Sequence, residues 1–159
     1  MVDNPYPFTN KIWQPDNGFV ATFESQGSQR TITKLVSINP YQIEEMGKAC
    51  YNLGFGDLVA DTDTGRVTVD DKVESNNGDI VRVFNTVVSL LDEFFGYVPD
   101  ATVHVGGSTN QRISVYCKII SRKWGQVEPY YFVQGCDGQE LEDFKPGNDY
   151  IFILISKKP

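Results

Sequence analysis

The stretch Gly78–Phe95, GDIVRVFNTVVSLLDEFF, decides the fold because it carries the clearest helical pattern in the chain. Apolar residues recur there at intervals of three and four, so a helix places them on one side. They are Ile80, Val83, Phe84, Val87, Val88, Leu91, Phe94 and Phe95, and the other side carries Arg82, Asn85, Ser89, Asp92 and Glu93. Asn76, Asn77 and Asp79 offer acceptors for the first turn, and Gly96 ends the helix. The pattern predicts the central helix of the core.

The segments before this helix predict antiparallel strands. Four runs are rich in β-forming residues: Phe19–Glu24, Arg30–Ile38, Cys50–Phe55 and Arg66–Asp70. Between the second and third runs, Asn39 is a candidate N-cap and Pro40 a candidate first residue for a helical turn at Tyr41–Lys48. Together the four runs predict an antiparallel meander.

The segments after the central helix supply a second helix and three more strands. The second helix, Asn110–Lys123, has an apolar side formed by Ile113, Tyr116, Cys117, Ile120 and Trp124. The strands are Ala101–Val105, Tyr130–Gln134 and Tyr150–Ser156. The order β-β-β-β-α-β-α-β-β predicts an α+β fold, with a single mixed, largely antiparallel sheet of about six to seven strands packed by two main amphipathic helices.

Length and composition favour one domain that spans residues 1–159. A chain of 159 residues is long enough to bury a core without metal or disulfide support, and 40% of its residues are hydrophobic. Residues 1–18 contain Pro5, Pro7 and Pro15, which predicts an extended N-terminal arm anchored by Phe8 and Trp13.

Charge and cysteine content disfavour several classes of protein. The net charge of −7 and the pI near 4.6 argue against nonspecific nucleic-acid binding, which uses a basic surface. Cys50, Cys117 and Cys136 form no C-x-x-C pair, so the usual zinc and redox motifs are absent. The sequence shows no signal peptide, and its longest apolar run, Ile151–Ile155, is too short to span a membrane. We expect a cytoplasmic protein with no cofactor and no metal.

The junction between the strand at Ala101–Val105 and the second helix is the candidate binding site. Its turn, Gly106-Gly107-Ser108-Thr109, leaves backbone N–H groups at the positive end of a helix, where anions bind. Arg112, about one turn into the helix, is placed to clamp a phosphate or carboxylate. The alternative is structural, because glycine allows a tight turn and Ser108 or Thr109 caps the helix.

The second helix also carries a candidate contact surface for a protein partner. Lys118 and Arg122 project from its polar side, and Lys123 lies at the border with the core. Cations concentrated on one helix of an acidic protein suit an acidic partner or a nucleic acid, although a solvated helix face has the same pattern.

Residues with catalytic or metal-binding chemistry form no complete motif. His104, the only histidine, lies near Ser108 in sequence, but no third member of a triad is identifiable, which favours a hydrogen-bonded histidine on a sheet face. Acidic residues crowd one stretch: Asp57, Asp61, Asp63, Asp70, Asp71, Glu74 and Asp79. The spacing Asp61-x-Asp63-x-Gly65 resembles the start of a calcium loop but lacks the later ligands, so a solvated hairpin is favoured.

Four segments are distinctive in combination. They are Tyr51–Asp57 (YNLGFGD), Ser75–Asp79 (SNNGD), Gly107-Ser108-Thr109 with Arg112 and Tyr116, and the closing aromatic strand. Together they resemble a family of small bacterial proteins of unknown function, over the chain from about Phe19 to the C-terminus. The resemblance implies a cytosolic single-domain protein without a known cofactor, in which the glycine turn and the Asn-Asn-Gly-Asp segment are the positions to test. Such proteins sometimes act beside a second short protein, as toxin–antitoxin pairs do.

Two functional hypotheses follow from these observations. The first is a noncatalytic binding or interaction module whose partner surface is the second helix and the turn before it. The second is a small transferase or toxin-like enzyme acting on a phosphate-bearing substrate such as a nucleotide, a coenzyme A thioester or RNA. The enzyme needs a general base near the glycine turn, either His104 or an acid from Asp57–Asp79. The lack of a complete catalytic motif favours the binding module.

Overall fold

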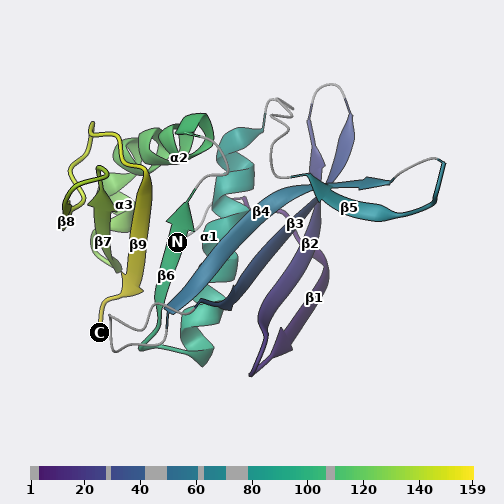
Figure 1. Ribbon diagram of the computed structural model, residues 1–159, viewed down its shortest axis with the longest axis horizontal. Coiled ribbons are helices and arrows are strands. Elements are labelled where there is room, and N and C mark those ends of the chain that lie inside the picture. The colour runs from purple at the N-terminus through teal and green to yellow at the C-terminus, as the bar shows by residue number, and fades with distance from the viewer. Residues whose placement is uncertain (1–3, 28–29, 42–49, 61–62, 71–78, 107–109) are drawn as a thin grey trace.

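The computed structural model describes residues 4–27, 30–41, 50–60, 63–70, 79–106 and 110–159. These residues form nine strands and three helices (Figure 1). In chain order the elements are β1 (Phe8–Gln14), β2 (Gly18–Gln26), β3 (Thr31–Pro40), β4 (Cys50–Ala60), β5 (Val67–Asp70), α1 (Ile80–Tyr97), β6 (Thr102–Gly106), α2 (Asn110–Arg122), α3 (Trp124–Val127), β7 (Tyr131–Cys136), β8 (Leu141–Asp143) and β9 (Phe152–Lys157).

All nine described strands belong to one mixed sheet, so the predicted α+β class is confirmed. Eight strands lie in the order β1-β2-β3-β4-β6-β9-β7-β8, and β5 pairs with β4 outside this path. Among the described pairs, β4 and β6 alone are parallel, as expected for two strands joined by the helical crossover α1. The predicted six to seven strands were too few, because β1 and the three-residue β8 were missed.

Strand β1 gives the predicted N-terminal arm a defined place in the fold. It pairs antiparallel with β2, and Phe8 and Trp13 pack against the core as predicted. The Trp13 ring centre lies 4.8 Å from that of Phe19 and 5.1 Å from that of Tyr97. The four residues between Phe8 and Trp13 are all exposed. The segment therefore has no alternation of apolar and polar residues by which a strand is recognised.

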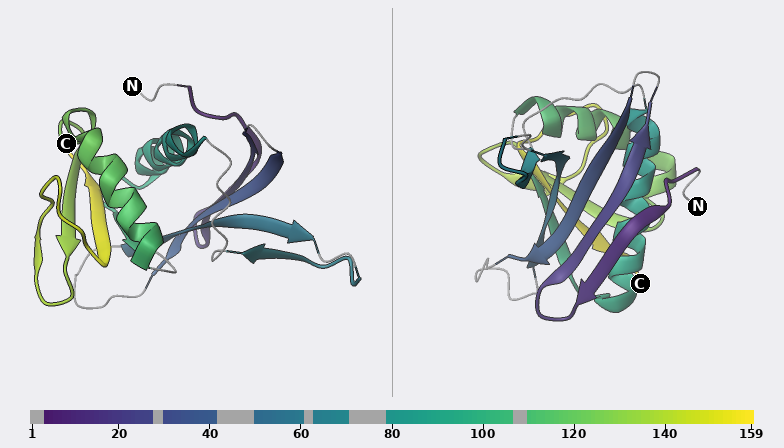
Figure 2. Two further views of the ribbon diagram at one scale, coloured as in Figure 1. Left: turned by 90° about the horizontal axis from the view of Figure 1, so that it is seen from above. Right: turned by 90° about the vertical axis from the view of Figure 1, so that its right-hand side faces the viewer.

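Both long helices lie on the same side of the sheet (Figure 2). Strands β1–β3 curve around α1, and α2 lies nearer to β7 and β9. Alternate residues of the strands point toward the helices and form the core with α1. Its largest fully buried side chains include Phe19, Phe23, Val36, Ile38, Val103, Ile153, Leu90, Phe94 and Ile113. Burying one such side chain stabilises the fold by about 1.5–3 kcal/mol.

The curvature of the sheet changes which residues of α1 are buried. Val83, Leu91, Phe94 and Phe95 are buried as predicted. The prediction was wrong for Ile80, which is 49% exposed, and for Asn85, which is buried although it was assigned to the polar side. Thr86 and Leu90 are buried as well. Together with Asn85 they form a second buried flank of α1, and periodicity alone does not reveal the neighbours that cover it.

Tyr6 fastens the N-terminal segment to this flank of α1. Its backbone N–H donates to Thr86 Oγ1 at 2.8 Å, and its hydroxyl donates to Asp79 Oδ2 at 2.6 Å. Ser25 of β2 donates to the same carboxylate oxygen at 2.5 Å. Asp79 thus forms no side-chain cap on α1, contrary to the sequence prediction, because its carboxylate links the arm, β2 and the start of the helix. Asn76 and Asn77 lie outside the described residues.

A second local prediction is corrected at the end of β3. Asn39 and Pro40 are strand residues opposite Asn52 and Tyr51 of β4, so they do not begin a helix. Cross-strand pairing outweighs the capping preference of Asn39 here. The helical turn predicted after them falls almost entirely on residues 42–49, outside the described part of the chain.

Replacing Tyr6 by phenylalanine is expected to destabilise the protein by about 1.5–3 kcal/mol, the usual contribution of a hydrogen bond to a charged group. The change removes the bond to Asp79, together with the bond that Tyr6 Oη accepts from the Gln26 backbone N–H at 3.0 Å, and keeps the ring. Urea unfolding measures the loss, with Tyr97→Phe as the control because Tyr97 is 56% exposed. Equal stability of the two variants would show that the Tyr6–Asp79 bond does not hold the arm.

Candidate functional site

The predicted strand-turn-helix junction lies between β6 and α2. Gly106 is the last residue of β6, and α2 begins at Asn110. Gly107, Ser108 and Thr109 lie outside the described residues, and Arg112 belongs to α2 with its side chain outside the description. The flanking elements are therefore those predicted, and the anion site itself stays a prediction.

His104 lies beside the start of this junction, on the face of the sheet that the helices do not cover. Its Nδ1 lies 3.0 Å from Asn52 Oδ1, and Asn52 is its partner on β4. Its ring stacks on Tyr41, with centres 5.3 Å apart and an angle of 15°. A Cβ atom at Gly106 would lie 3.1 Å from His104 Cε1, so glycine leaves the space that the ring needs. The predicted hydrogen-bonded sheet histidine is confirmed.

The surroundings of His104 favour its neutral form. Burial lowers the pKa of the imidazole. Because Asn52 Oδ1 is an acceptor, Nδ1 carries the proton and donates, which leaves Nε2 as the basic nitrogen. A basic nitrogen next to Gly106 meets one requirement of the enzyme hypothesis, a candidate general base near the turn.

An NMR titration of the His104 Cε1 proton is expected to give a pKa below the ordinary value of about 6.5. Between about pH 6.5 and the lower pKa of the folded protein, His104 of the unfolded chain binds a proton that the folded protein does not. The free energy of unfolding therefore decreases as the pH decreases through this range. The decrease is expected to be smaller in His104→Asn. Assignment is direct because the sequence has one histidine. A measured pKa at or above 6.5 would contradict the described burial of the ring.

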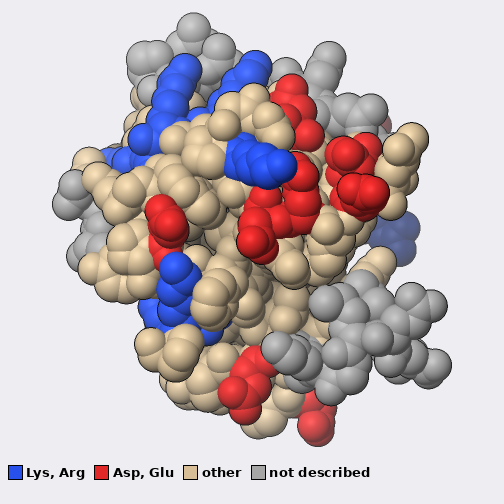
Figure 3. Space-filling view, turned by 90° about the vertical axis from the view of Figure 1, so that its left-hand side faces the viewer, with Lys and Arg blue, Asp and Glu red and all other residues tan. Residues whose placement is uncertain are grey.

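The outer face of α2 carries the predicted partner-contact residues. Lys118 and Arg122 are exposed and Lys123 is half-buried, and none of the three forms an ion pair within the described residues. The inward residues Ile113, Cys117 and Ile120 are buried as predicted. Basic side chains gather at the top of the face in Figure 3, at the end of the molecule where α2 lies, with acidic ones beside them. Contact with a partner through this face stays a prediction.

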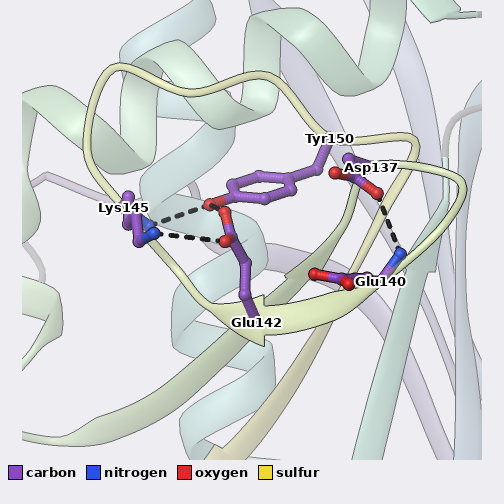
Figure 4. Close-up of polar contacts among 5 residues, drawn as sticks. All are labelled: Asp137, Glu140, Glu142, Lys145 and Tyr150. Carbon is purple, nitrogen blue, oxygen red and sulfur yellow. Dashed lines mark hydrogen bonds and ion pairs between the residues drawn. The ribbon is translucent and has the colours of Figure 1, made fainter.

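The segment between β7 and β9 borders α2 and is held by its own hydrogen bonds. Glu142 Oε1 accepts from the Tyr150 hydroxyl at 2.8 Å, and Glu142 pairs with Lys145 at 3.2 Å (Figure 4). The hydrogen bond from Tyr150, and to a smaller extent the one from Lys145, lowers the pKa of the Glu142 carboxyl. Asp149 Oδ1 accepts from Ser114 of α2 at 3.2 Å. These contacts fix the segment against the helix.

The acidic residues singled out in the sequence do not converge on one site in the described structure. Asp57 of β4 forms a buried ion pair with Lys34 of β3, and Asp79 binds Tyr6 and Ser25. Asp63 is exposed. Asp61, Asp71 and Glu74, together with the side chain of Asp70, lie outside the description. Within the residues described, no group of three or more His, Cys, Asp or Glu is placed to hold a metal ion.

The three cysteines are free thiols in the structure. Cys50 and Cys117 are buried, and burial raises the pKa of both thiols, which lowers their reactivity. Cys136 is half-buried on β7.

The structure also contains an apolar cavity that sequence reasoning missed. It lies between α1, α2 and the helix-covered face of the sheet, is partly enclosed, and has a volume of about 70 Å³. Helices supply Ile80, Val83, Phe84, Val87, Val88, Leu91, Tyr116, Ile120 and Val127, and strands supply Leu53, Phe55, Val105, Tyr131, Val133, Ile153 and Ile155. Every one of these lining side chains is aliphatic or aromatic. The apolar stripe of α1 was the available signal, although its spacing does not distinguish a filled core from a cavity.

Comparison with known proteins places the chain in a family. The profile of a family of unknown function, DUF6934, matches residues 3–158. The chain belongs to the DUF6934 family. The DUF6934 match includes β1 and so begins earlier than the resemblance noted from Phe19 onward. No curated protein and no solved structure matches the chain. No helix in the described part of this DUF6934 chain is long and apolar enough to cross a membrane.

Proposed function

We propose that the protein is a noncatalytic binding domain that holds a small apolar ligand in the cavity between α1, α2 and the sheet. The observation that carries this proposal is the cavity itself. Protein interiors are normally packed as densely as organic crystals, and an apolar void loses dispersion contacts. An aliphatic and aromatic lining supplies affinity by burying the surface of a ligand.

The chemistry of the lining supports binding without covalent change. None of the lining residues carries a carboxylate, ammonium, thiol or imidazole group. Two tyrosine hydroxyls, on Tyr116 and Tyr131, are the polar groups that the lining residues bring. Such a surface suits retention of an apolar molecule, because proton transfer or nucleophilic attack uses groups of another kind.

Ethylbenzene is expected to bind in this cavity and to shift the methyl resonances of Leu53, Val105 and Ile120. The methyl resonances of Ile12 and Val20, whose side chains are exposed outside the cavity, are expected not to shift. A ligand present at 100 times its dissociation constant adds about 2.7 kcal/mol to stability. The melting temperature is therefore expected to rise by several degrees.

A matched pair of variants on α1 tests the location. Val88→Phe fills the cavity from a half-exposed position and is expected to weaken binding by about tenfold, or ~1.4 kcal/mol. Val81→Phe adds the same ring at a position that is 45% exposed and does not line the cavity, so affinity is expected to be unchanged. Equal weakening by both variants, or no shift of the cavity methyl groups, would refute the proposal.

A second candidate function is a transferase that acts on a phosphate-bearing substrate at the glycine turn. The observation that favours it is the position of His104 beside Gly106, with its proton on Nδ1 and a basic Nε2. In this hypothesis Arg112 and the turn hold the phosphate and His104 is the general base.

Inorganic phosphate, nucleotides and coenzyme A separate this candidate from the first. If the turn binds an anion, one of them is expected to raise the melting temperature by several degrees in the wild type and not in Arg112→Ala. Arg122→Ala is the control, since Arg122 is an exposed arginine further along the same helix. A rise that is lost in both variants, or no rise at all, argues against an anion site at the turn.

A further inference from the structure

Tyr131, whose ring forms part of the cavity wall, has a buried hydroxyl without a hydrogen bond in the described structure. The residue belongs to β7, is 4% exposed and lines the cavity with its ring. Its Oη is buried and has no hydrogen-bond partner within the described structure. The ring packs against Phe95 of α1, with centres 6.0 Å apart. Most buried hydroxyls in proteins are hydrogen-bonded, so this group calls for a physical explanation.

Phenylalanine would fill the same apolar position without this disadvantage. A buried donor with no partner lowers stability, whereas an apolar group of the same shape does not. A tyrosine in such a place is explained when a bound molecule supplies the missing acceptor. This is the pattern of ligand sites, in which a mostly apolar wall contains a few polar groups that fix orientation.

We infer that the ligand of the cavity is a neutral carbonyl compound, a ketone, aldehyde or ester, whose oxygen accepts a hydrogen bond from Tyr131 Oη. This inference rests on the proposed function of the cavity. One buried donor without a partner among the described residues matches one acceptor in the ligand. Oη is buried and the surface of the cavity is formed by apolar atoms, so contact between Oη and a ligand requires a change of side-chain rotamers, which is common on binding.

The charges around Tyr131 favour a neutral ligand. The ammonium group of Lys157 lies 4.7 Å from the centre of the Tyr131 ring, but it is paired with Asp92 at 3.6 Å. Lys157 does not line the cavity, and no lining residue is charged. An ionised carboxylate would lose its hydration there without gaining a counter-charge, which is costly.

The size of the cavity favours a compact molecule. An engineered apolar cavity of about 150 Å³ binds benzene. The present cavity, at about 70 Å³, is smaller but only partly enclosed, so it takes a compact apolar group and leaves the rest of the ligand at the mouth. Acetophenone and ethylbenzene have similar shapes and differ in the carbonyl group, which makes them a matched pair of probes.

The test compares the affinities of the two probes for wild type, Tyr131→Phe and Tyr130→Phe by calorimetry. In the wild type, acetophenone is expected to bind about three- to tenfold more tightly than ethylbenzene, the effect of one neutral hydrogen bond. Tyr131→Phe is expected to remove this preference, so that the two probes bind with similar affinity. Tyr130→Phe, at the neighbouring exposed position, is expected to keep the preference.

The outcomes separate this inference from the proposed function. Equal binding of both probes, with no effect of Tyr131→Phe on either, overturns the carbonyl inference and leaves the binding cavity standing. No binding of either probe overturns both. A wild-type preference for acetophenone that persists in Tyr131→Phe overturns the role of this hydroxyl.

A measurement on the wild type keeps the test valid if Tyr131→Phe fails to fold. With ¹³Cζ-labelled tyrosine, the Tyr131 Cζ resonance is expected to move on addition of acetophenone by more than on addition of ethylbenzene. Equal movement with both probes overturns the inference. Urea unfolding of the ligand-free proteins is expected to find Tyr131→Phe as stable as the wild type or more stable, since an unpaired buried hydroxyl is removed.

Discussion

The packing of α1 into the curve of the sheet is the constraint on which the rest of the structure depends. Leu90 and Phe94 are fully buried, and they meet apolar side chains from strands that are distant in sequence, such as Phe19 and Val103. Because two flanks of α1 are buried, β1 and the segment around Tyr6 pack against this helix as well as against the sheet. The polar groups on that flank are satisfied locally: Thr86 Oγ1 accepts from Tyr6 and donates to the carbonyl oxygen of Arg82.

The cavity follows from the same arrangement. Two helices share one face of a sheet that bends around the first of them, and the space between them is bounded mostly by valine and isoleucine side chains. Such side chains have few rotamers and adapt poorly to fill an irregular gap. The cavity therefore stays unfilled by side chains within an otherwise buried core. Its wall is apolar because most of the lining positions belong to the inward pattern of a helix or strand.

The cavity and the His104 side chain lie on opposite faces of the sheet. Val105 of β6 lines the cavity, whereas the preceding residue, His104, faces the side without helices and contacts Tyr41 and Phe152. Alternation along one strand thus separates an apolar binding surface from a basic imidazole. A ligand in the cavity would not contact His104 directly, because the backbone of the sheet lies between them. The two sites can be tested independently.

The sequence by itself determined the α+β class, both long helices and seven of the described strands, because these elements carry local periodicity over many residues. It also identified Phe8 and Trp13 as anchors and His104 as a hydrogen-bonded sheet histidine. Only the tertiary structure decided that Asp79 binds Tyr6 and Ser25, that Asn39 belongs to a strand, that Asn85 is buried, and that the stripe of α1 borders a cavity. The physical reason is that periodicity records which side of an element is apolar. How many neighbours cover that side, and whether they fill it, depends on contacts between residues far apart in the chain.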